Sequence, residues 1–261
     1  MIGAIIGDIV GSRFEFDNIK TKNFDLFTFD CDFTDDTVMT LAVAKALSRY
    51  SADKDFKRIP VETMHEVGGQ YPSCGYGGLF LDWIMDERTE PYNSCGNGSA
   101  MRVSSVGWYS KTLAEAEELA KLSAEVTHNH PEGIKGAKAV AGAIFLAKTR
   151  ADKESIRQYI EDNYYALDFT LDEIRPTYDY EIVCQTSVPQ AIQAFLESTD
   201  FEDAIRNAIS IGGDSDTIAA ICGSIAEAYY GVEGDLKETA LSYLDDYLLD
   251  IYEECTKTIR R

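Results

Sequence analysis

Two short acidic stretches carry the side chains in this sequence that are best suited to chemistry. In the first, Asp214, Asp216 and Thr217 follow a double glycine and precede an apolar run over residues 218–230. That run is rich in Ala and Ile, contains no proline and stops at Gly231, so it predicts a buried helix. Asp216 or Thr217 would cap this helix, and Asp214 would then be one more negative charge than a cap needs.

The second acidic stretch repeats this pattern. Thr34-Asp35-Asp36-Thr37 precedes an apolar run over residues 38–47, which predicts a second buried helix. If the two helix starts meet, four carboxylates and the Thr hydroxyls offer hard oxygen ligands, which suit Mg²⁺ or Mn²⁺ rather than Zn²⁺. Four carboxylates exceed the charge of one divalent ion, so we interpret the pattern as a two-metal site. The alternative is two separate helix caps with solvated acids.

The composition limits the partners that the chain can bind. Asp and Glu number 45 against 24 Lys and Arg, which gives a formal net charge of −21 at pH 7. Such a surface repels phosphate backbones, so general nucleic-acid binding is not expected. A pocket for one diphosphate remains compatible with this charge, because backbone amides can supply the donors.

Cysteine usage and the apolar runs indicate the compartment. The six cysteines are scattered without a C-x-x-C pair, and Cys222 lies in an apolar run, as buried free thiols often do. The first residues lack the basic region of a signal peptide and reach Asp8 too early for one. No apolar segment approaches the length of a membrane span. We therefore expect a cytoplasmic protein that does not associate with membranes.

The first residues predict a helix with one flat face, because Gly3, Gly7 and Gly11 recur every four residues. The alternative role for these glycines is a nucleotide-binding G-x-G-x-x-G turn after a strand, and the sequence lacks that motif here. The segment 12–30 mixes Phe, Asp, Asn and Lys without a clear period and is expected to form a loop or flap. It carries Glu15, which by itself would be a solvated acid.

Two glycine-rich stretches are candidates for substrate contact. Residues 68–78 contain five glycines and one proline, which preclude regular structure, and their two tyrosines favour a substrate-contacting loop over a linker. At 96–99, Asn97 and Gly98 form either a hairpin turn or the beginning of a helix. In the second case the free amides and the Ser99 hydroxyl would form an anion cradle.

Two histidines, His128 and His130, precede a helix in which Pro131 fits the first position. As a pair they suggest zinc, but no Cys or further His lies near in sequence. His130 is then either a cap of this helix or a group that points into a cleft. We predict that it contacts substrate and does not ligate metal.

The remaining patterns predict one helix after another, and alternating strand patterns are scarce. The expected helices are 115–125, 153–164, 188–196 beginning with Pro189, 201–209 capped by Asp200, and 236–252 with its acids outward. The predicted fold is all-α: a compact many-helix bundle that forms a single domain over residues 1–261 and contains a dinuclear metal cleft.

The chain resembles the ADP-ribosylglycohydrolases, the ADP-ribosyl-acceptor hydrolases that include the dinitrogenase reductase-activating enzyme. The resemblance rests on GDIVGSRFE (7–15), FTDDT (33–37), GNGSAMR (96–102), THNHP (127–131) and GGDSDT (212–217). These blocks follow the family's order over nearly the whole chain, and together they are specific. Ser215 departs from the Thr that many members carry between the two aspartates, at a position to which we assign no metal contact.

The resemblance implies roles for individual residues. Two Mg²⁺ (or Mn²⁺) ions would be held by Thr34, Asp35, Asp36, Asp214, Asp216 and Thr217, with Asp216 bridging both. Glu15 would be a movable carboxylate that closes over the metals, and it would act with Asp36 and Asp216 in catalysis. The loop with Asn97, Gly98 and Ser99 would lie against the diphosphate of the substrate.

The function that these patterns favour is a metal-dependent hydrolase that cleaves the glycosidic bond between ADP-ribose and a modified acceptor, either a protein side chain or a small molecule. The metals would coordinate the ribose diol and orient a water beside the anomeric carbon. One alternative is a module that binds ADP-ribose without turnover, which would be marked by a broken metal set. The other is a different two-metal hydrolase such as a phosphatase, a class that usually recruits His among its ligands.

Overall fold

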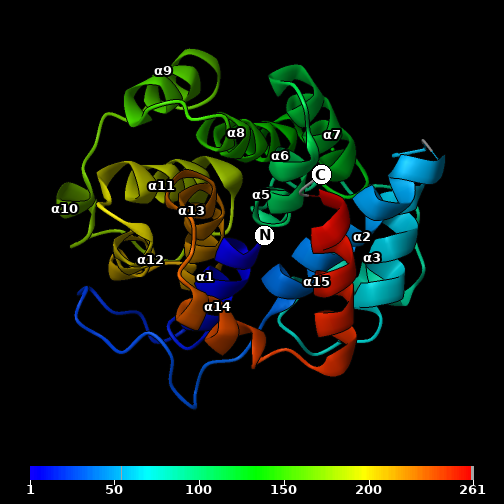
Figure 1. The fold of residues 1–261 in the computed structure, drawn as a ribbon, viewed down its shortest axis with the longest axis horizontal. Coiled ribbons are helices and arrows are strands. Elements are labelled where there is room, and N and C mark those ends of the chain that lie inside the picture. The colour runs from blue at the N-terminus through cyan, green and yellow to red at the C-terminus, as the bar shows by residue number, and fades with distance from the viewer. Residues whose placement is uncertain (54, 260–261) are drawn as a thin grey trace.

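A computed structural model describes residues 1–53 and 55–259 (Figure 1). Within these residues the regular secondary structure is helical, apart from one isolated bridge between Gly96 and Val183. The all-α prediction is therefore confirmed. In chain order the helices are α1 (Ile2–Ser12), α2 (Asp35–Asp53), α3 (Ile59–Gly68), α4 (Gly78–Met85), α5 (Gly98–Met101), α6 (Ser104–Tyr109), α7 (Leu113–Glu125), α8 (Pro131–Lys148), α9 (Lys153–Asn163), α10 (Leu171–Ile174), α11 (Cys184–Glu197), α12 (Phe201–Ser210), α13 (Ser215–Tyr230), α14 (Gly234–Leu241) and α15 (Asp246–Ile259).

The centre of the fold is α13, whose residues are buried from Ser215 to Glu227. Helix α1 packs along it, and α8, α11 and α12 contact its other sides. In Figure 1, α7, α8 and α9 lie above this centre, while α2, α3 and α15 lie to its right. One continuous cluster of buried apolar side chains runs through these helices.

The predicted glycine face of α1 is confirmed, because it lies directly against α13. A Cβ on Gly3 would come within 2.1 Å of the Gly223 carbonyl oxygen, and one on Gly7 within 2.1 Å of the Ala219 carbonyl oxygen. Since real Cβ atoms do not approach so closely, only glycine allows this separation of the two backbones. The close contact brings the acidic residues of α1 and α13 to the same place.

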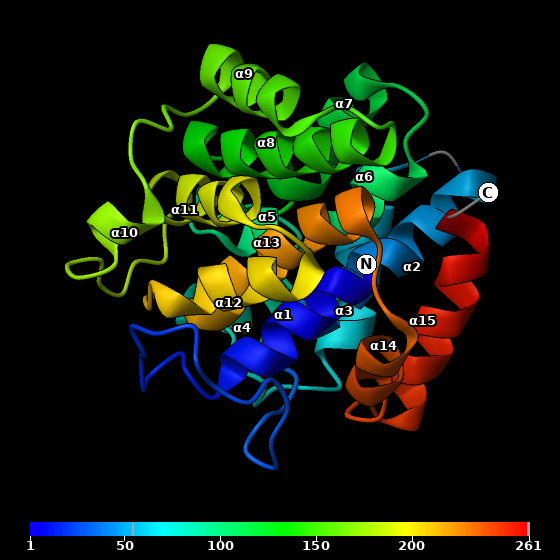
Figure 2. The ribbon, with the colours of Figure 1, turned by 60° about the vertical axis from the view of Figure 1, so that its left-hand side comes forward.

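Residues 13–34, called here the Glu15 segment, connect α1 to α2 without regular structure, as predicted for 12–30. Figure 2 shows this segment in dark blue below α1 and α12, outside the helical core. Residues 69–77 likewise form an irregular connection between α3 and α4. The first connection ends at the first turn of α2, and in the second the Cys74 carbonyl accepts from the Asp35 N–H at 2.9 Å.

Two predicted helix starts are wrong. The N-cap position of α13 is Asp214, whose side chain makes no capping hydrogen bond, so neither Asp216 nor Thr217 is the cap. Their side chains make other contacts, described below. Helix α11 begins at Cys184 and contains Pro189 inside it. The proline removes one helical hydrogen bond near the beginning of the helix, and the burial of the surrounding side chains outweighs that loss.

The predicted helix over 236–252 is two helices, α14 and α15, with a break between Leu241 and Asp246. The side chain of Asp245 accepts a hydrogen bond from the backbone N–H of Leu248 at 2.9 Å. Asp245 therefore begins a new helix. The sequence pattern treated it as one of several outward-facing acids on a continuous helix. The cap predicted at Asp200 is confirmed, because its side chain accepts from the Asp203 N–H at 2.8 Å.

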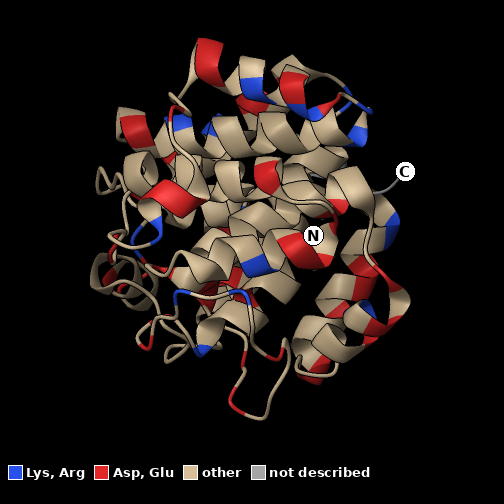
Figure 3. Ribbon diagram, turned by 90° about the vertical axis from the view of Figure 1, so that its left-hand side faces the viewer, with Lys and Arg blue, Asp and Glu red and all other residues tan. Residues whose placement is uncertain are grey.

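The acidic composition is visible on the ribbon, where Asp and Glu positions outnumber Lys and Arg positions (Figure 3). Within the described residues, none of the helices combines the length and the hydropathy that a bilayer crossing requires. The cysteines are free thiols, as predicted.

Gly7→Ala should destabilise the protein by about 2–3 kcal/mol, because the new methyl group forces α1 away from α13. Gly234→Ala is the matched control: it lies in a helix, and a Cβ there would meet open space. The control should change the free energy of unfolding by less than about 1 kcal/mol. Urea unfolding measures both, and equal effects would show that the α1–α13 separation does not depend on glycine.

Candidate active site

Asp8 on α1 connects the core to the first acidic stretch. Its side chain is fully buried. One carboxylate oxygen accepts from the backbone N–H groups of Thr34 and Thr37, both at 3.0 Å, and the other accepts from the Thr34 hydroxyl at 2.6 Å. No local sequence pattern assigns Asp8 a role in a site. The available signal was a lone acid within a helix that is otherwise apolar, because buried carboxylates are rare unless they are paired.

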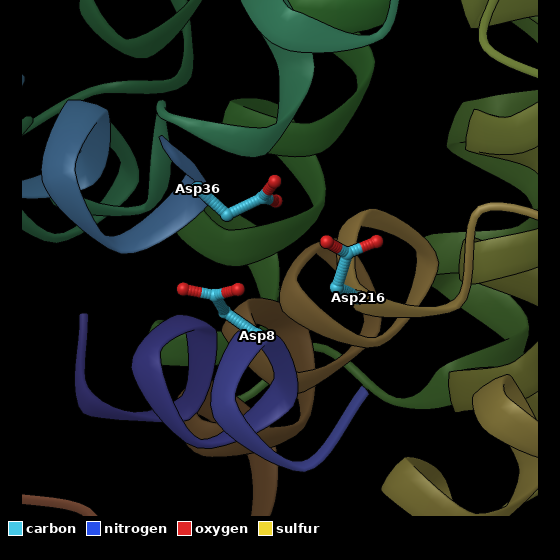
Figure 4. Close-up of side chains that lie close together, drawn as sticks. All are labelled: Asp8, Asp36 and Asp216. Carbon is cyan, nitrogen blue, oxygen red and sulfur yellow. The ribbon is translucent and has the colours of Figure 1, made fainter. Parts of the chain in front are cut away.

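Three buried carboxylates, from α1, α2 and α13, point toward one another (Figure 4). Asp8, Asp36 and Asp216 each offer a carboxylate oxygen, and these oxygens lie within 4.8 Å of one another. Two hydroxyls tie the group together. Thr217 donates to Asp36 at 2.9 Å, and Thr34 lies 3.4 Å from Asp216. The two predicted acidic stretches therefore do meet.

A second group of carboxylates shares Asp216 with the first. Oxygens of Glu15, Asp214 and Asp216 also lie within 4.8 Å of one another. Asp214 is 5% exposed and accepts a hydrogen bond from the side-chain amide of Asn97 at 2.6 Å. Glu15 reaches the group from the segment outside the core. Asp216 thus stands between two adjacent sets of oxygen ligands.

Burial and mutual repulsion make this cluster a poor place for bare negative charge. Burial, followed by the charges of neighbouring carboxylates, raises the pKa of Asp36 and of Asp216 well above its usual range. Burial also raises the pKa of Asp8 to about 6 and that of Glu15 to about 7. One oxygen of Asp36 is buried without a hydrogen-bond partner. Cations would satisfy both the charge and this oxygen, and an all-oxygen donor set fits Mg²⁺ or Mn²⁺.

The six predicted metal ligands occupy three kinds of position. Asp36, Asp214 and Asp216 belong to the two carboxylate groups, and the Thr34 and Thr217 hydroxyls hydrogen-bond to members of those groups. Asp35 belongs to neither group, although it is half-buried and lines the adjoining cavity. Burial, followed by the charge of Asp8, raises its pKa well above the usual range.

A cavity of about 350 Å³ opens beside the carboxylate groups. Its acidic wall contains Glu15, Asp35, Asp214 and Thr217. The rest of the lining is mostly apolar and includes Met39, Leu79, Phe80, Tyr92, Met101 and Ile182. A ligand that fills this cavity would therefore place a polar group against the acids and an apolar or aromatic group against the apolar lining.

The glycine loop at 96–98 lines this cavity, and α5 begins at Gly98, so a helix start rather than a hairpin turn is found there. Asn97 and Gly98 are both part of the cavity wall. Ser99 is not, because it is fully buried and its hydroxyl donates to the Gly133 carbonyl at 2.7 Å. Its predicted place in an anion cradle therefore has no geometric support.

His128, and not His130, is the histidine of the cavity wall. His130 caps α8, since its ring nitrogen Nδ1 accepts from the Glu132 N–H at 3.1 Å. Its contact with substrate thus stays a prediction. The His128 ring nitrogen Nδ1 lies 2.7 Å from the Thr127 hydroxyl. Burial holds the pKa of His128 well below its usual range, so this imidazole is neutral.

Arg102 places a buried cation at the cavity. Its side chain is 1% exposed and belongs to the cavity wall. The guanidinium donates to the Ser123 carbonyl at 2.7 Å and to the Thr127 hydroxyl at 3.0 Å, and its Nε has no partner. Burial lowers the pKa of Arg102 to about 10, so it remains charged at neutral pH. Opposite charges therefore stand on different parts of one cavity.

Comparisons with known proteins give concordant matches. The sequence model of the ADP-ribosylglycohydrolase family matches residues 1–260. The chain is 26% identical to ADP-ribosylhydrolase ARH3 of Mus musculus over 314 residues, which cover 89% of this chain and 83% of that protein. It is 25% identical to ADP-ribosylarginine hydrolase Tri1 of Pseudomonas putida, in a match that covers 90% of this chain and 70% of that protein. A solved structure, an ADP-ribosylglycohydrolase-related protein complex, matches with a TM-score of 0.72 at 20% sequence identity. The match covers 99% of this chain and 97% of that chain, and it shows that the two share a fold.

The raised pKa values predict how stability responds to pH when metal is removed. Asp8 has a folded-state pKa of about 6 against an ordinary 3.8, so folding favours its protonated form. In chelator, stability should therefore fall as pH rises from about 4 to about 6. Mg²⁺ or Mn²⁺ should restore the melting temperature, and more strongly at pH 7 than at pH 5, because the ions compete with protons. Thermal melts that are indifferent to chelator and to both ions at pH 7 would count against the metal site.

Proposed function

Because this chain belongs to the ADP-ribosylglycohydrolase family, we propose that it is a metal-dependent hydrolase that cleaves the glycosidic bond between ADP-ribose and a modified acceptor. The observation that carries this proposal is the convergence of buried carboxylates from α1, α2 and α13, next to Glu15 and Asp214, which line a cavity. The charges that most strongly affect Asp36 and Asp216 are those of other carboxylates. Such a cluster is suited to hold cations beside a bound ligand.

We assign two Mg²⁺ or Mn²⁺ ions to this cluster. Their ligands would be Thr34, Asp35, Asp36, Asp214, Asp216 and Thr217. Asp216 is suited to bridge the ions because it belongs to both carboxylate groups. When bound, the ions would supply positive charge that orients the ribose hydroxyls and lowers the pKa of a water. Asp8 would hold the Thr34–Thr37 stretch in place through its three hydrogen bonds.

The two walls of the cavity fit the two ends of an ADP-ribosyl group. The apolar wall with Phe80, Tyr92 and Ile182 can pack against the flat base, while the ribose at the scissile bond lies against the acids. Asn97 and Gly98 line the same cavity, as does the buried Arg102 cation, and a diphosphate would lie against these residues. Ser99 and His130 belong to the predicted substrate set without lining the cavity.

Glu15 is the proposed catalytic carboxylate, acting with Asp36 and Asp216. It lines the cavity and reaches the acidic cluster from the Glu15 segment. Its pKa of about 7 lets it exchange a proton near neutral pH. Glu15 can therefore orient the scissile unit and accept a proton from an attacking water. The cytoplasm is the compartment we propose, in keeping with the free thiols.

A panel of ADP-ribosylated acceptors tests the proposal: arginine-linked, serine-linked and nucleobase-linked substrates, each with Mg²⁺, with Mn²⁺ and with chelator. We expect metal-dependent release of ADP-ribose from at least one class. Binding of ADP-ribose without release from any substrate would instead identify a binding module. Metal-dependent hydrolysis of phosphate esters alone would identify another two-metal hydrolase.

Glu15→Gln should lower turnover by on the order of a hundredfold or more, because it removes a positioned proton-transfer group. Metal binding and the melting temperature should stay near their original values. Asp17→Asn is the matched control, since Asp17 is an exposed acid in the same segment. Turnover of Glu15→Gln near that of the control would remove Glu15 from the catalytic set.

Asp216→Asn should release or displace at least one metal ion and nearly abolish activity, because it removes the charge that lets two cations lie close together. Ser215→Thr should be almost silent, because it keeps a hydroxyl at a residue that belongs to neither carboxylate group. Calorimetric titration with Mn²⁺ and an ADP-ribose release assay measure the two effects. Equal damage from both substitutions would mean that the turn is sensitive to packing and not to metal charge.

A further inference from the structure

The position of Glu15 needs an explanation, because its neighbours repel it. Its carboxylate lies within 4.8 Å of oxygens of Asp214 and Asp216, and the charge of Asp214 is among the causes that raise its pKa. Phe14, the residue before it, belongs to the buried core, but the Glu15 side chain itself is only half-buried. Another contact must keep the carboxylate over the acidic groups.

The backbone near Glu15 is attached to the turn before α13. The Asn18 side chain donates to the Gly213 carbonyl at 2.9 Å and accepts from the Gly213 N–H at 2.6 Å. The Lys20 ammonium donates to the Tyr178 carbonyl at 2.6 Å and to the Ile211 carbonyl. These bonds attach the segment to two others, the 211–213 turn and the connection between α10 and α11. They hold the backbone in place, and none of them involves the Glu15 carboxylate.

Tyr180, in the connection between α10 and α11, makes the contact that acts on the side chain. Its hydroxyl donates to the Glu15 carboxylate at 3.0 Å, and its ring lies 5.9 Å from that of Phe16, centroid to centroid. Both rings are exposed, Phe16 by 84% and Tyr180 by 42%. An exposed aromatic pair adds little to the core, so its value lies in joining the two segments.

We propose that Tyr180 is a positioning residue for Glu15, and that its hydroxyl and ring together latch the Glu15 segment to the connection between α10 and α11. The hydroxyl supplies the attraction that opposes repulsion by Asp214 and Asp216. The Tyr180 ring, tilted against that of Phe16, restrains the residue next to Glu15. The predicted effect on turnover rests on the proposed function, whereas the effect on the segment itself does not.

Tyr180→Phe tests this role because it removes the hydroxyl and keeps the ring. Turnover should fall about ten- to a hundredfold, as expected for the loss of one hydrogen bond to a charged group. The KM should change by less than about threefold. Hydrogen exchange of residues 13–20, measured without substrate, should become faster.

Tyr243→Phe is the matched control, because its hydroxyl donates to the Thr28 carbonyl of the same segment at 3.0 Å, away from Glu15. Its turnover should stay within about twofold of the original.

The double variant separates positioning from direct contact with substrate. In a Glu15→Gln background, Tyr180→Phe should cause little further loss of the residual turnover, because the group that Tyr180 positions is already gone. A full additional loss in that background would overturn the proposal, and so would unchanged exchange of residues 13–20. If the unaltered protein releases no ADP-ribose from any acceptor, the proposed function fails, and the exchange measurement alone then decides whether the latch exists.

Discussion

The mutual repulsion of buried carboxylates is the constraint on which this structure depends. Asp8, Asp36 and Asp216 come from three different helices and are nearly inaccessible to water. Hydrogen bonds from Thr34, Thr37 and Thr217 stabilise part of this charge, yet one Asp36 oxygen remains without a partner. Evolution of a stable core alone would replace such acids with apolar residues. The proposed cations would offset this charge, and this would explain why the acids are retained next to the residues of the cavity wall.

The rest of the fold supports this cluster. The glycines of α1 allow its backbone to touch that of α13, which sets Asp8 beside Asp216. Asp8 then fixes the beginning of α2 by accepting two backbone N–H groups, and this places Asp36. The acidic cluster is thus built on rigid helices, whereas Glu15 arrives on an irregular segment. With the proposed metals bound, a rigid centre and a separately attached carboxylate would let the ligand enter before the site is complete.

Much of this arrangement could be predicted from sequence, because its signals are local. The paired acid and Thr motifs, the double glycine and the apolar runs predict two buried helices, and the resemblance to the ADP-ribosylglycohydrolases is confirmed over residues 1–260. The spacing of Gly3, Gly7 and Gly11 is another local signal, and it predicts close helix packing. Each of these features depends on neighbouring residues in one stretch of chain.

The features that sequence reasoning missed depend on distant contacts. Asp8 gains its role from Thr34 and Thr37, and Tyr180 from Glu15, and no local pattern links these pairs. His128 and His130 have the same chemistry, and the packing of α8 decides which one lines the cavity. The break at Asp245 was missed because a capping acid and an outward-facing acid look the same in a helical pattern.

Anomalous diffraction from crystals of the protein soaked in Mn²⁺ tests the central claim most directly. The account predicts two manganese peaks among the carboxylates, one in each of the two groups that share Asp216, and both should vanish after soaking in chelator. Crystals that bind Mn²⁺ only at the protein surface, with the cluster of Asp8, Asp36 and Asp216 free of anomalous density, would contradict it.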